Sequence, residues 1–321
     1  MLFRTSRLRL WWQSPGSHEA KQDPGATRGQ TMCAEATKLI ETFELTPKRL
    51  EDADLPLLHE LSVGVRWPHR AEDLRLLMEM GEGLIACDPI GRIVGSAMWF
   101  PMGTFANIGM VITSPKLQAR GTGQWLVEQA IAACGLESYR LNATRAAYRL
   151  YISMGFEPVA TVHQRQGIVT APPAVAPVQG QVRPAGAEDL AAIIALDTAA
   201  NGAPRAELMA RLMELGPALV LETAGEVIGA AFRRRAGRGQ VIGPVIAPDE
   251  DAAMALTAPH LAALEGRFAR LDTMRTGARF IDLLEGSGLA PFDTVTHMTL
   301  GPVVPRSGAV QHWGLVNQPL G

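Results

Sequence analysis

Residues 111–123 read VITSPKLQARGTG, and they restrict the possible folds more than any other part of the chain. An apolar strand ends, a short loop follows, and a helix begins among the glycines. The first turn of a helix has unpaired backbone N–H groups and the positive end of the helix dipole. Because Gly121 and Gly123 lack a Cβ, the backbone there can approach a diphosphate closely. The stretch predicts a phosphate-binding loop; the alternative is a helix start whose glycines only allow close packing.

Two common nucleotide-binding motifs do not fit this loop. A P-loop ends in Gly-Lys-Ser/Thr, whereas Gly123 is followed by Gln124 and Trp125. A dinucleotide fingerprint needs a third glycine in GxGxxG, and Leu126 occupies that position. The loop therefore belongs to another class.

The chain also contains an internal repeat. The matching segments are residues 91–97 (GRIVGSA) with 225–231 (GEVIGAA), 108–112 (IGMVI) with 242–246 (IGPVI), 78–81 (MEMG) with 213–216 (MELG), and 155–158 (GFEP) with 288–291 (GLAP). The offset is 134 for the first two pairs, from 91 to 225 and from 108 to 242. Four matches in one order at nearly one offset predict two copies of a single folding unit.

Five segments follow from the repeat. Residues 40–168 are expected to form a catalytic domain, 169–180 a proline-rich linker, 181–301 a degenerate second copy, and 302–321 a C-terminal tail. Residues 1–39 are expected to be a disordered leader, because arginines precede the first acidic residue, Glu19, and a Ser/Gly/Pro-rich run follows. The leader is either an organellar transit peptide or an over-extended start before Met32.

Apolar spacing and glycine turns predict the elements of the first copy. Strands are expected at 43–46, 83–87, 92–100, 104–113, 139–142 and 156–164, and helices at 52–61, 71–80, 121–134 and 145–153. The order β-α-α-β-β-β-α-β-α-β predicts an α/β fold, with a mixed sheet covered by helices.

Composition excludes several classes of protein. The 321 residues suffice for two domains, and 47% hydrophobic with 19% charged residues is typical of a globular chain. A net charge of −2 gives no support for nucleic-acid binding. No apolar run reaches the length of a membrane span, and three scattered cysteines suggest neither a disulfide framework nor a metal site. We expect a cytoplasmic monomer or homodimer with no metal, nucleic-acid or membrane partner.

A second motif adds a family resemblance. Residues 144–156, TRAAYRLYISMGF, are similar to N-x-x-A-x-x-L-Y-x-x-x-G-F, the second signature of the GNAT superfamily of N-acetyltransferases. Ala147, Leu150 and Tyr151 match in register, and Thr144 replaces the usual asparagine. Gln118-x-x-Gly121-x-Gly123 likewise resembles the Q/R-x-x-G-x-G/A loop of that family.

The resemblance implies acetyl-CoA as co-substrate and a set of site residues. A strand that splays from its neighbour would hold the pantetheine through Val111, Ile112 and Thr113. The pyrophosphate loop and its surroundings would comprise Gln118, Ala119, Arg120, Gly121, Thr122, Gly123, Gln124 and Thr144. Tyr151 would protonate the departing thiolate, since a phenol remains protonated at neutral pH. The alternative for Tyr151 is a half-buried packing residue.

The second copy is predicted to have lost the cofactor site. Asp249, Glu250 and Asp251 stand where the first copy has its glycine loop, and carboxylates repel a pyrophosphate. Leu284 replaces the tyrosine. The arrangement resembles bacterial two-domain GNAT proteins, as do Trp67-Pro68-His69 and the closing residues 314–321.

Three functions stay open at this point. The chain acetylates a small primary amine, acetylates a protein terminus or lysine, or senses acyl-CoA without catalysis. Trp67, His69 and His297 are candidate acceptor-site residues, and Trp313 and Arg279 are weaker ones; packing is the alternative for each. His69, His163 and Glu82 are candidate general bases, with a water chain as the alternative.

Overall fold

The computed structural model describes residues 37–40, 43–118, 120–302 and 308–321. The first repeat consists of β1 (Lys38–Ile40), β2 (Phe43–Arg49), α1 (Leu55–Gly64), α2 (Ala71–Met80), β3 (Glu82–Cys87), β4 (Ile93–Met102), β5 (Phe105–Thr113), α3 (Thr122–Cys134), β6 (Ser138–Ala143), α4 (Tyr148–Ser153) and β7 (Glu157–Ile168). From β2 onward the order of strands and helices is the predicted one.

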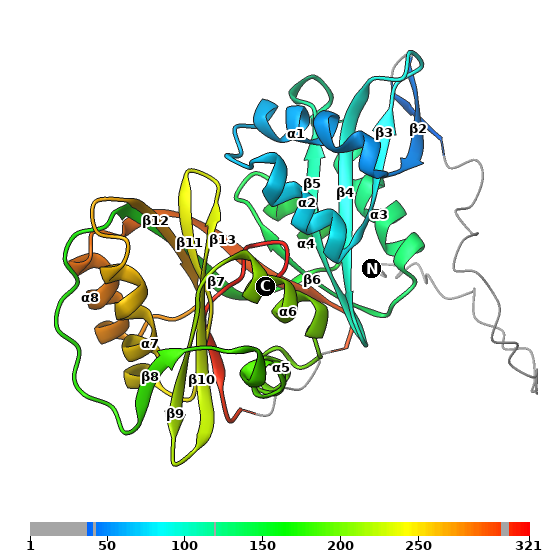
Figure 1. Cartoon of the computed structure of the whole chain (residues 1–321). Helices are drawn as coiled ribbons and strands as arrows, with labels where there is room; N and C mark the ends of the chain where they lie inside the picture. Colours follow the sequence, from blue (N-terminus) through cyan, green and yellow to red (C-terminus); the bar gives the residue numbers. More distant parts are fainter. Residues whose placement is uncertain (1–36, 41–42, 119, 303–307) are drawn as a thin grey trace, which may run out of the picture. The chain divides into compact units, whose positions relative to one another are not determined.

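The second repeat has the same order of elements, which confirms the internal duplication (Figure 1). It consists of β8 (Gln181–Pro184), α5 (Leu190–Asn201), α6 (Ala206–Leu215), β9 (Ala218–Thr223), β10 (Glu226–Ala236), β11 (Gly239–Ala247), α7 (Glu250–Ala262), β12 (Phe268–Thr273), α8 (Ala278–Gly286) and β13 (Ala290–Leu300). A further strand, β14 (Gln311–Gly314), has no counterpart in the first repeat. Among the described helices, none combines the length and the apolar character that crossing a membrane requires.

Several boundaries differ from the prediction. Strand β1 begins at Lys38, so the predicted domain start at residue 40 falls inside this strand. Helix α4 begins at Tyr148 instead of residue 145, because residues 144–147 form a turn in which Ala147 N–H donates to the Thr144 carbonyl at 3.0 Å. Such local turns compete with helix formation and are hard to recognise from periodicity.

The two repeats exchange their last strands. The strand order is β1-β2-β3-β4-β5-β6-β13-β7-β12-β11-β10-β9-β8. Strand β13 of the second repeat pairs with β6, the fifth strand of the first repeat counted from β2. Strand β7 of the first repeat pairs in turn with β12. Backbone hydrogen bonds therefore cross between the repeats in both directions and fix the walls of any site between them.

Strand β4 explains how the helices cover the first repeat. Side chains of a strand alternate between its two faces, so Met98 and Phe100 pack on one side while Ala97 and Trp99 pack on the other. The first face meets α1 and α2, and the second meets α3. The cluster on the α1–α2 face extends into the second repeat, where it includes side chains of α5 and α6. The repeats thus share one apolar core.

Candidate active site

The strands β5 and β6 separate halfway along their length. Their parallel pairing covers only Phe105 to Ile108 on β5 and Ser138 to Leu141 on β6. Beyond this point β5 continues to Thr113, paired with β4 on its other side. Residues 109–113 and 142–143 therefore border an opening, here called the β5–β6 gap. The edge of β5 in this gap can pair with the amide groups of an extended ligand.

A β-bulge lies at the beginning of the gap. Met110 has a φ of 50°, unusual for a residue with a side chain, and the ladder with β4 shifts register there. Ile108 packs with the α3–α4 side of the sheet, whereas Met110 and Ile112 pack on the α1–α2 side. The bulge thus reverses the alternation of side chains. Buried Ser96 supports it by donating from Oγ to the Met110 carbonyl at 2.8 Å.

The predicted phosphate loop has the backbone conformation that its glycines suggested. Gly121 precedes the first residue of α3 with a φ of 74°, in the left-handed region. A Cβ on Gly123 would lie 3.3 Å from Leu150 of α4, so this glycine also serves helix packing. Gln118 closes the loop by donating from Nε2 to the Thr113 carbonyl at 3.2 Å. Predicted Ala119 lies outside the described residues.

The polar side chains of Thr122 and Gln124 form hydrogen bonds within the protein. The Thr122 side chain is buried, with its Oγ1 3.5 Å from the Leu117 carbonyl. Gln124 donates from Nε2 to Glu128, one turn along α3, at 2.8 Å. Arg120 is exposed. The side chains of Thr122 and Gln124 are therefore engaged by other groups of the protein.

A cation missed by the sequence analysis lies beside this loop. The Nζ of Lys38 is 3.2 Å from the position that a Cβ on Gly121 would occupy. Strand β1 carries this lysine to the start of α3, where an ammonium group and the helix dipole both favour an anion. The prediction missed Lys38 because it counted residues 1–39 as a leader.

Tyr151 lies in a buried cluster on the α3–α4 side of the sheet. Only 5% of the residue is exposed, and its ring meets Phe156 edge to face at 5.6 Å. Burial raises the pKa of the phenol, which keeps it protonated at neutral pH. Ile108 belongs to the same cluster and also lines the cavity described next.

A cavity of about 300 Å³ lies between the repeats. Its lining residues from the first repeat are Arg66, Trp67, Pro68, His69, Asp73, Leu77, Ile108, Gly109, Met110, Asn142, Thr144, Gln164 and Gln166. Those from the rest of the chain are Arg234, Ala236, Gly237, Arg238, Val241, Phe268, Arg270, Asp272, Phe292, Asp293, Val295, Leu315, Asn317, Gln318 and Pro319. The cavity thus reaches the bulge and the mouth of the β5–β6 gap, and both repeats enclose it.

The predicted acceptor residues Trp67 and His69 line this cavity. The Nδ1 of His69 lies 2.8 Å from Ser62 Oγ, and its carbonyl lies 2.9 Å from Nε2 of His59. Burial lowers the pKa of His69 to about 4, so the imidazole is neutral at neutral pH. Such a weakly basic group is poorly suited to take a proton from an alkylammonium.

The remaining predicted residues differ in their position relative to the cavity. His297 on β13 is buried, and its Nδ1 lies 3.1 Å from Oδ1 of the cavity residue Asn142. Thr144 lines the cavity, and its Oγ1 accepts from Ala147 N–H at 3.4 Å, as a capping hydroxyl would. Predicted residues that do not line the cavity are Tyr151, His297, Trp313, Arg279, His163 and Glu82.

Comparisons with known proteins agree with this geometry. Residues 80–158 match the model of an acetyltransferase (GNAT) domain, and residues 193–310 match a second model of the same description. The chain belongs to the GNAT superfamily of acetyltransferases. It is a tandem GNAT protein, because each repeat carries its own match.

Three similar proteins illustrate the relationship. YitH of Bacillus subtilis (strain 168), an uncharacterised N-acetyltransferase, is 26% identical over 191 residues, 58% of this chain and 67% of YitH. The structure of a proposed acetyltransferase from Pyrococcus horikoshii has a TM-score of 0.73 at 16% identity, over 89% of this chain and 99% of that one. A tandem GNAT protein from the clavulanic acid biosynthesis pathway has a TM-score of 0.58 at 15% identity, over 81% and 99%. At identities this low, the likeness to these structures establishes the fold of this chain and does not extend to a substrate.

In the second GNAT repeat, the gap equivalent to the β5–β6 gap is filled by the chain itself. Strands β11 and β12 pair only from Gln240 to Val241. Strand β14 then takes the edge of β11, where Val245 faces Gly314. On the other side, Leu315 N–H donates to the Asp272 carbonyl at 2.8 Å. Residues 308–321, here called the C-terminal segment, thus occupy the place where the first repeat has an open strand edge.

The acidic residues Asp249, Glu250 and Asp251 of the second repeat also have partners within that repeat. Asp249 caps α7 by accepting from Ala252 N–H at 2.9 Å. Glu250 accepts from Phe280 N–H at 3.0 Å, and Arg279 pairs with both Glu250 and Asp251. A carboxylate therefore already occupies the start of α8, and the start of α7 carries negative charge.

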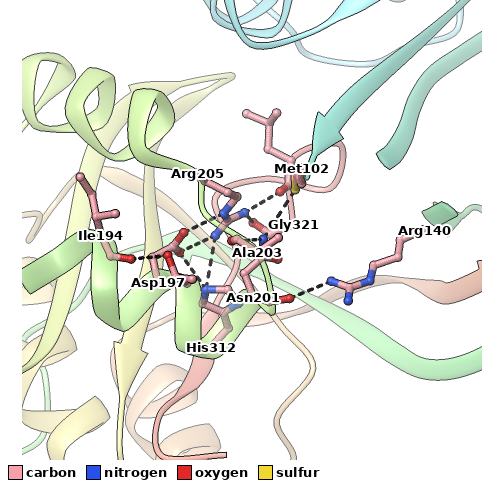
Figure 2. A network of polar contacts seen from close by, with 11 residues as sticks. Met102, Arg140, Ile194, Asp197, Asn201, Ala203, Arg205, His312 and Gly321 are labelled. Atoms are coloured by element: carbon pink, nitrogen blue, oxygen red, sulfur yellow. Dashed lines mark hydrogen bonds and ion pairs between the residues drawn. The ribbon is translucent and has the colours of Figure 1, made fainter. Parts of the chain in front are cut away.

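A buried ionic network holds the C-terminal segment (Figure 2). Arg205 binds Asp197 through two hydrogen bonds of 2.6 and 2.9 Å, and it donates to the carbonyl oxygens of Leu320 and Gly321 at 2.6 and 3.1 Å. The Nε2 of His312 lies 3.1 Å from Asp197. The network fixes the residues that precede and follow the cavity wall formed by Leu315, Asn317, Gln318 and Pro319.

Proposed function

We propose that this acetyltransferase transfers the acetyl group of acetyl-CoA to the primary amine of a small molecule, and that only the first repeat binds acetyl-CoA. One observation carries the proposal: a cavity of about 300 Å³, enclosed by both repeats, meets the β5–β6 gap at the bulge. This volume is at the lower end of the range for pockets that bury small ligands. A protein lysine or terminus would require an open groove instead.

The residues present fit acetyl-CoA. The free edge of Val111, Ile112 and Thr113 suits the amides of pantetheine, and the N–H groups at the start of α3 suit its pyrophosphate. The left-handed Gly121 keeps the loop free of a side chain, and Lys38 adds a positive charge beside it. Acetyl-CoA itself supplies the activated thioester.

The reaction then needs few groups of the protein. The neutral amine attacks the thioester carbonyl, a C–N bond forms, and the C–S bond breaks with its electrons moving to sulfur. A backbone N–H of the bulge, residues 109–111, stabilises the oxyanion. Tyr151 donates its proton to the sulfur and recovers one from solvent. The pKa of His69 is about 4, so we assign the removal of the amine proton to water.

The C-terminal segment fills the gap between β11 and β12 in the second repeat, and this supports a cofactor site in the first repeat alone. The C-terminal segment covers the edge of β11, and the acids at the start of α7 oppose a diphosphate. The second repeat would then act as a wall of the acceptor cavity.

The test compares two glycines of one helix. Gly121→Glu places a carboxylate in the phosphate loop, whereas Gly135→Glu places one at the far end of α3, where the φ is also positive at 67° and no atom lies within 4 Å of the new Cβ. We expect Gly121→Glu to abolish acetyl-CoA binding in calorimetry, while Gly135→Glu retains it. Equal affinities would exclude the loop as the phosphate site.

Turnover is measured separately, by thiol release with a panel of small amines and a panel of peptides. Acetylation of amines supports the proposal, whereas acetylation of peptides alone contradicts it. Acetyl-CoA binding without release of thiol under any condition would identify a sensor.

A further inference from the structure

Some of the charged side chains that line the cavity have ionic partners in the part of the protein that the structure describes, and others do not. Four arginines and three aspartates face it. Asp73, which is partly buried, accepts from Arg70 at 3.0 Å and from Gly237 N–H at 2.8 Å. Asp272 accepts two hydrogen bonds from Arg270, at 2.7 and 2.5 Å. Both carboxylates are therefore neutralised by the protein, and Arg270 is neutralised with Asp272.

Arg234 is the buried charge of this cavity that has no ion pair among the described residues. It is 4% exposed, and one terminal nitrogen donates to the Val316 carbonyl at 3.0 Å. Its Nε has no hydrogen-bond partner, and no carboxylate pairs with it in the described ranges. Burial lowers its pKa to about 10, so the guanidinium remains charged at neutral pH. An unpaired buried charge is strongly unfavourable, which favours an anionic partner.

Neighbouring arginines do not share this position. The Nε atoms of Arg165 and Arg233 also lack a partner, but neither residue lines the cavity, and Arg165 forms an ion pair with Glu285. Arg234 is thus the residue that combines burial, an unused donor and access to the cavity. The Val316 carbonyl, which belongs to the C-terminal segment, accepts a hydrogen bond from the guanidinium and orients it from one side.

We propose that the acceptor carries a carboxylate as well as its amine, and that Arg234 binds this carboxylate. The inference rests on the proposed function, because it concerns the acceptor of that reaction. A guanidinium offers parallel N–H groups that match the two oxygens of a carboxylate. Arg234 lines the cavity from the second repeat, and the bulge residues Gly109 and Met110 line it from the first, so one acceptor could contact both.

Binding of acceptors to the full chain, saturated with coenzyme A, provides the test. The probes are the twenty standard amino acids, their carboxamides and the corresponding decarboxylated amines. At least one carboxylate is expected to bind tenfold or more tightly than its carboxamide. Arg234→Gln should weaken that carboxylate by about 10- to 100-fold, the contribution of a charge-assisted hydrogen bond, and should leave the carboxamide unchanged.

Two variants serve as controls. Arg235→Gln removes the same charge from an exposed neighbour on β10 and should bind the carboxylate normally. Arg234→Lys keeps the charge without the planar fork and should recover part of the affinity. Unchanged coenzyme A affinity shows that each variant is folded.

The results separate this inference from the proposed function. The inference is overturned when no carboxylate binds, when carboxamides or polyamines bind equally well, or when the preference survives Arg234→Gln. The proposed function fails independently when carboxylates bind through Arg234 but none of them supports release of thiol from acetyl-CoA.

Discussion

Replacing Arg205 with methionine tests whether the C-terminal segment builds the acceptor site. The side chains of Arg205 and Asp197 are 2% and 0% exposed. Arg205→Met keeps most of the volume but leaves the Asp197 carboxylate buried, with His312 Nε2 at 3.1 Å as its remaining side-chain partner (Figure 2). It also removes the donor that holds the Leu320 and Gly321 carbonyls.

Breaking a buried ion pair in this way costs about 3–5 kcal/mol. At about 2 °C per kcal/mol, near the lower value for large domains, the melting temperature should fall by roughly 6–10 °C. Arg211→Met is the control, because Arg211 pairs with Glu79 and Glu214 on the surface and such pairs contribute about 1 kcal/mol or less. Scanning calorimetry measures both, and thiol release below the transition measures activity.

A double variant separates stability from positioning. Asp197→Leu with Arg205→Met removes the uncompensated charge, so it should regain much of the lost stability. Its acceptor KM should stay at least tenfold above that of the wild type, because the segment carrying Asn317 and Gln318 has lost its anchor. A double variant with normal acceptor KM, or a single variant as stable as Arg211→Met, would refute the reasoning.

Three further variants address separate groups. Tyr151→Phe should lower kcat at least tenfold with little change in acetyl-CoA affinity; full activity in thiol release removes the acid role. Lys38→Met should weaken acetyl-CoA binding severalfold and reduce its salt dependence, whereas Lys48→Met, near Asp54, should not; calorimetry at two ionic strengths decides. Burial lowers the pKa of His260 to about 4, so the unfolded state takes up its proton first and stability falls as pH drops from 6.5 to 4. His260→Gln should remove about 2 kcal/mol of the stability lost between pH 7 and pH 5 in urea unfolding, and an unchanged pH dependence would contradict this.

Local patterns predicted the individual elements well. The helix over 71–80 has buried Leu74 and Leu77 at helical spacing and an acidic residue, Asp73, that accepts from the Arg70 N–H at its start. Because each of these signals lies within about one helical turn, it can be recognised in the sequence. The duplication could also be predicted from the sequence, because related short segments recur at a fixed spacing.

The exchange of β7 and β13 between the repeats could not be predicted from the sequence. Strand pairing between residues more than a hundred positions apart leaves no local periodicity. The φ of 50° at Met110 is equally hidden, since methionine has no preference for the left-handed region. The prediction therefore identified the gap by family resemblance but missed the bulge at its mouth.

The acceptor side of the site was predicted least well. Trp67 and His69 were predicted from a short segment and line the cavity, but the cavity residues Arg234 and Asp272 come from strands of the second repeat that carry no motif. Their positions at the cavity depend on the exchanged strands, which bring β12 beside β7. A sequence with many scattered arginines gives no sign of which one is buried without a counter-ion.

The filled gap of the second repeat gives a physical reason for keeping a copy that, under the proposed function, binds no cofactor. An open edge on β11 would expose unpaired backbone groups, and β14 satisfies them. The same segment then continues to the first repeat, where Asn107 and Asn142 donate to the carbonyls of Pro319 and Gln318 at 3.2 and 2.6 Å. One segment therefore closes the second gap and walls the cavity beside the first. On this reasoning, creating a cofactor site in the second repeat would require removing the segment that forms part of the cavity wall beside the first repeat.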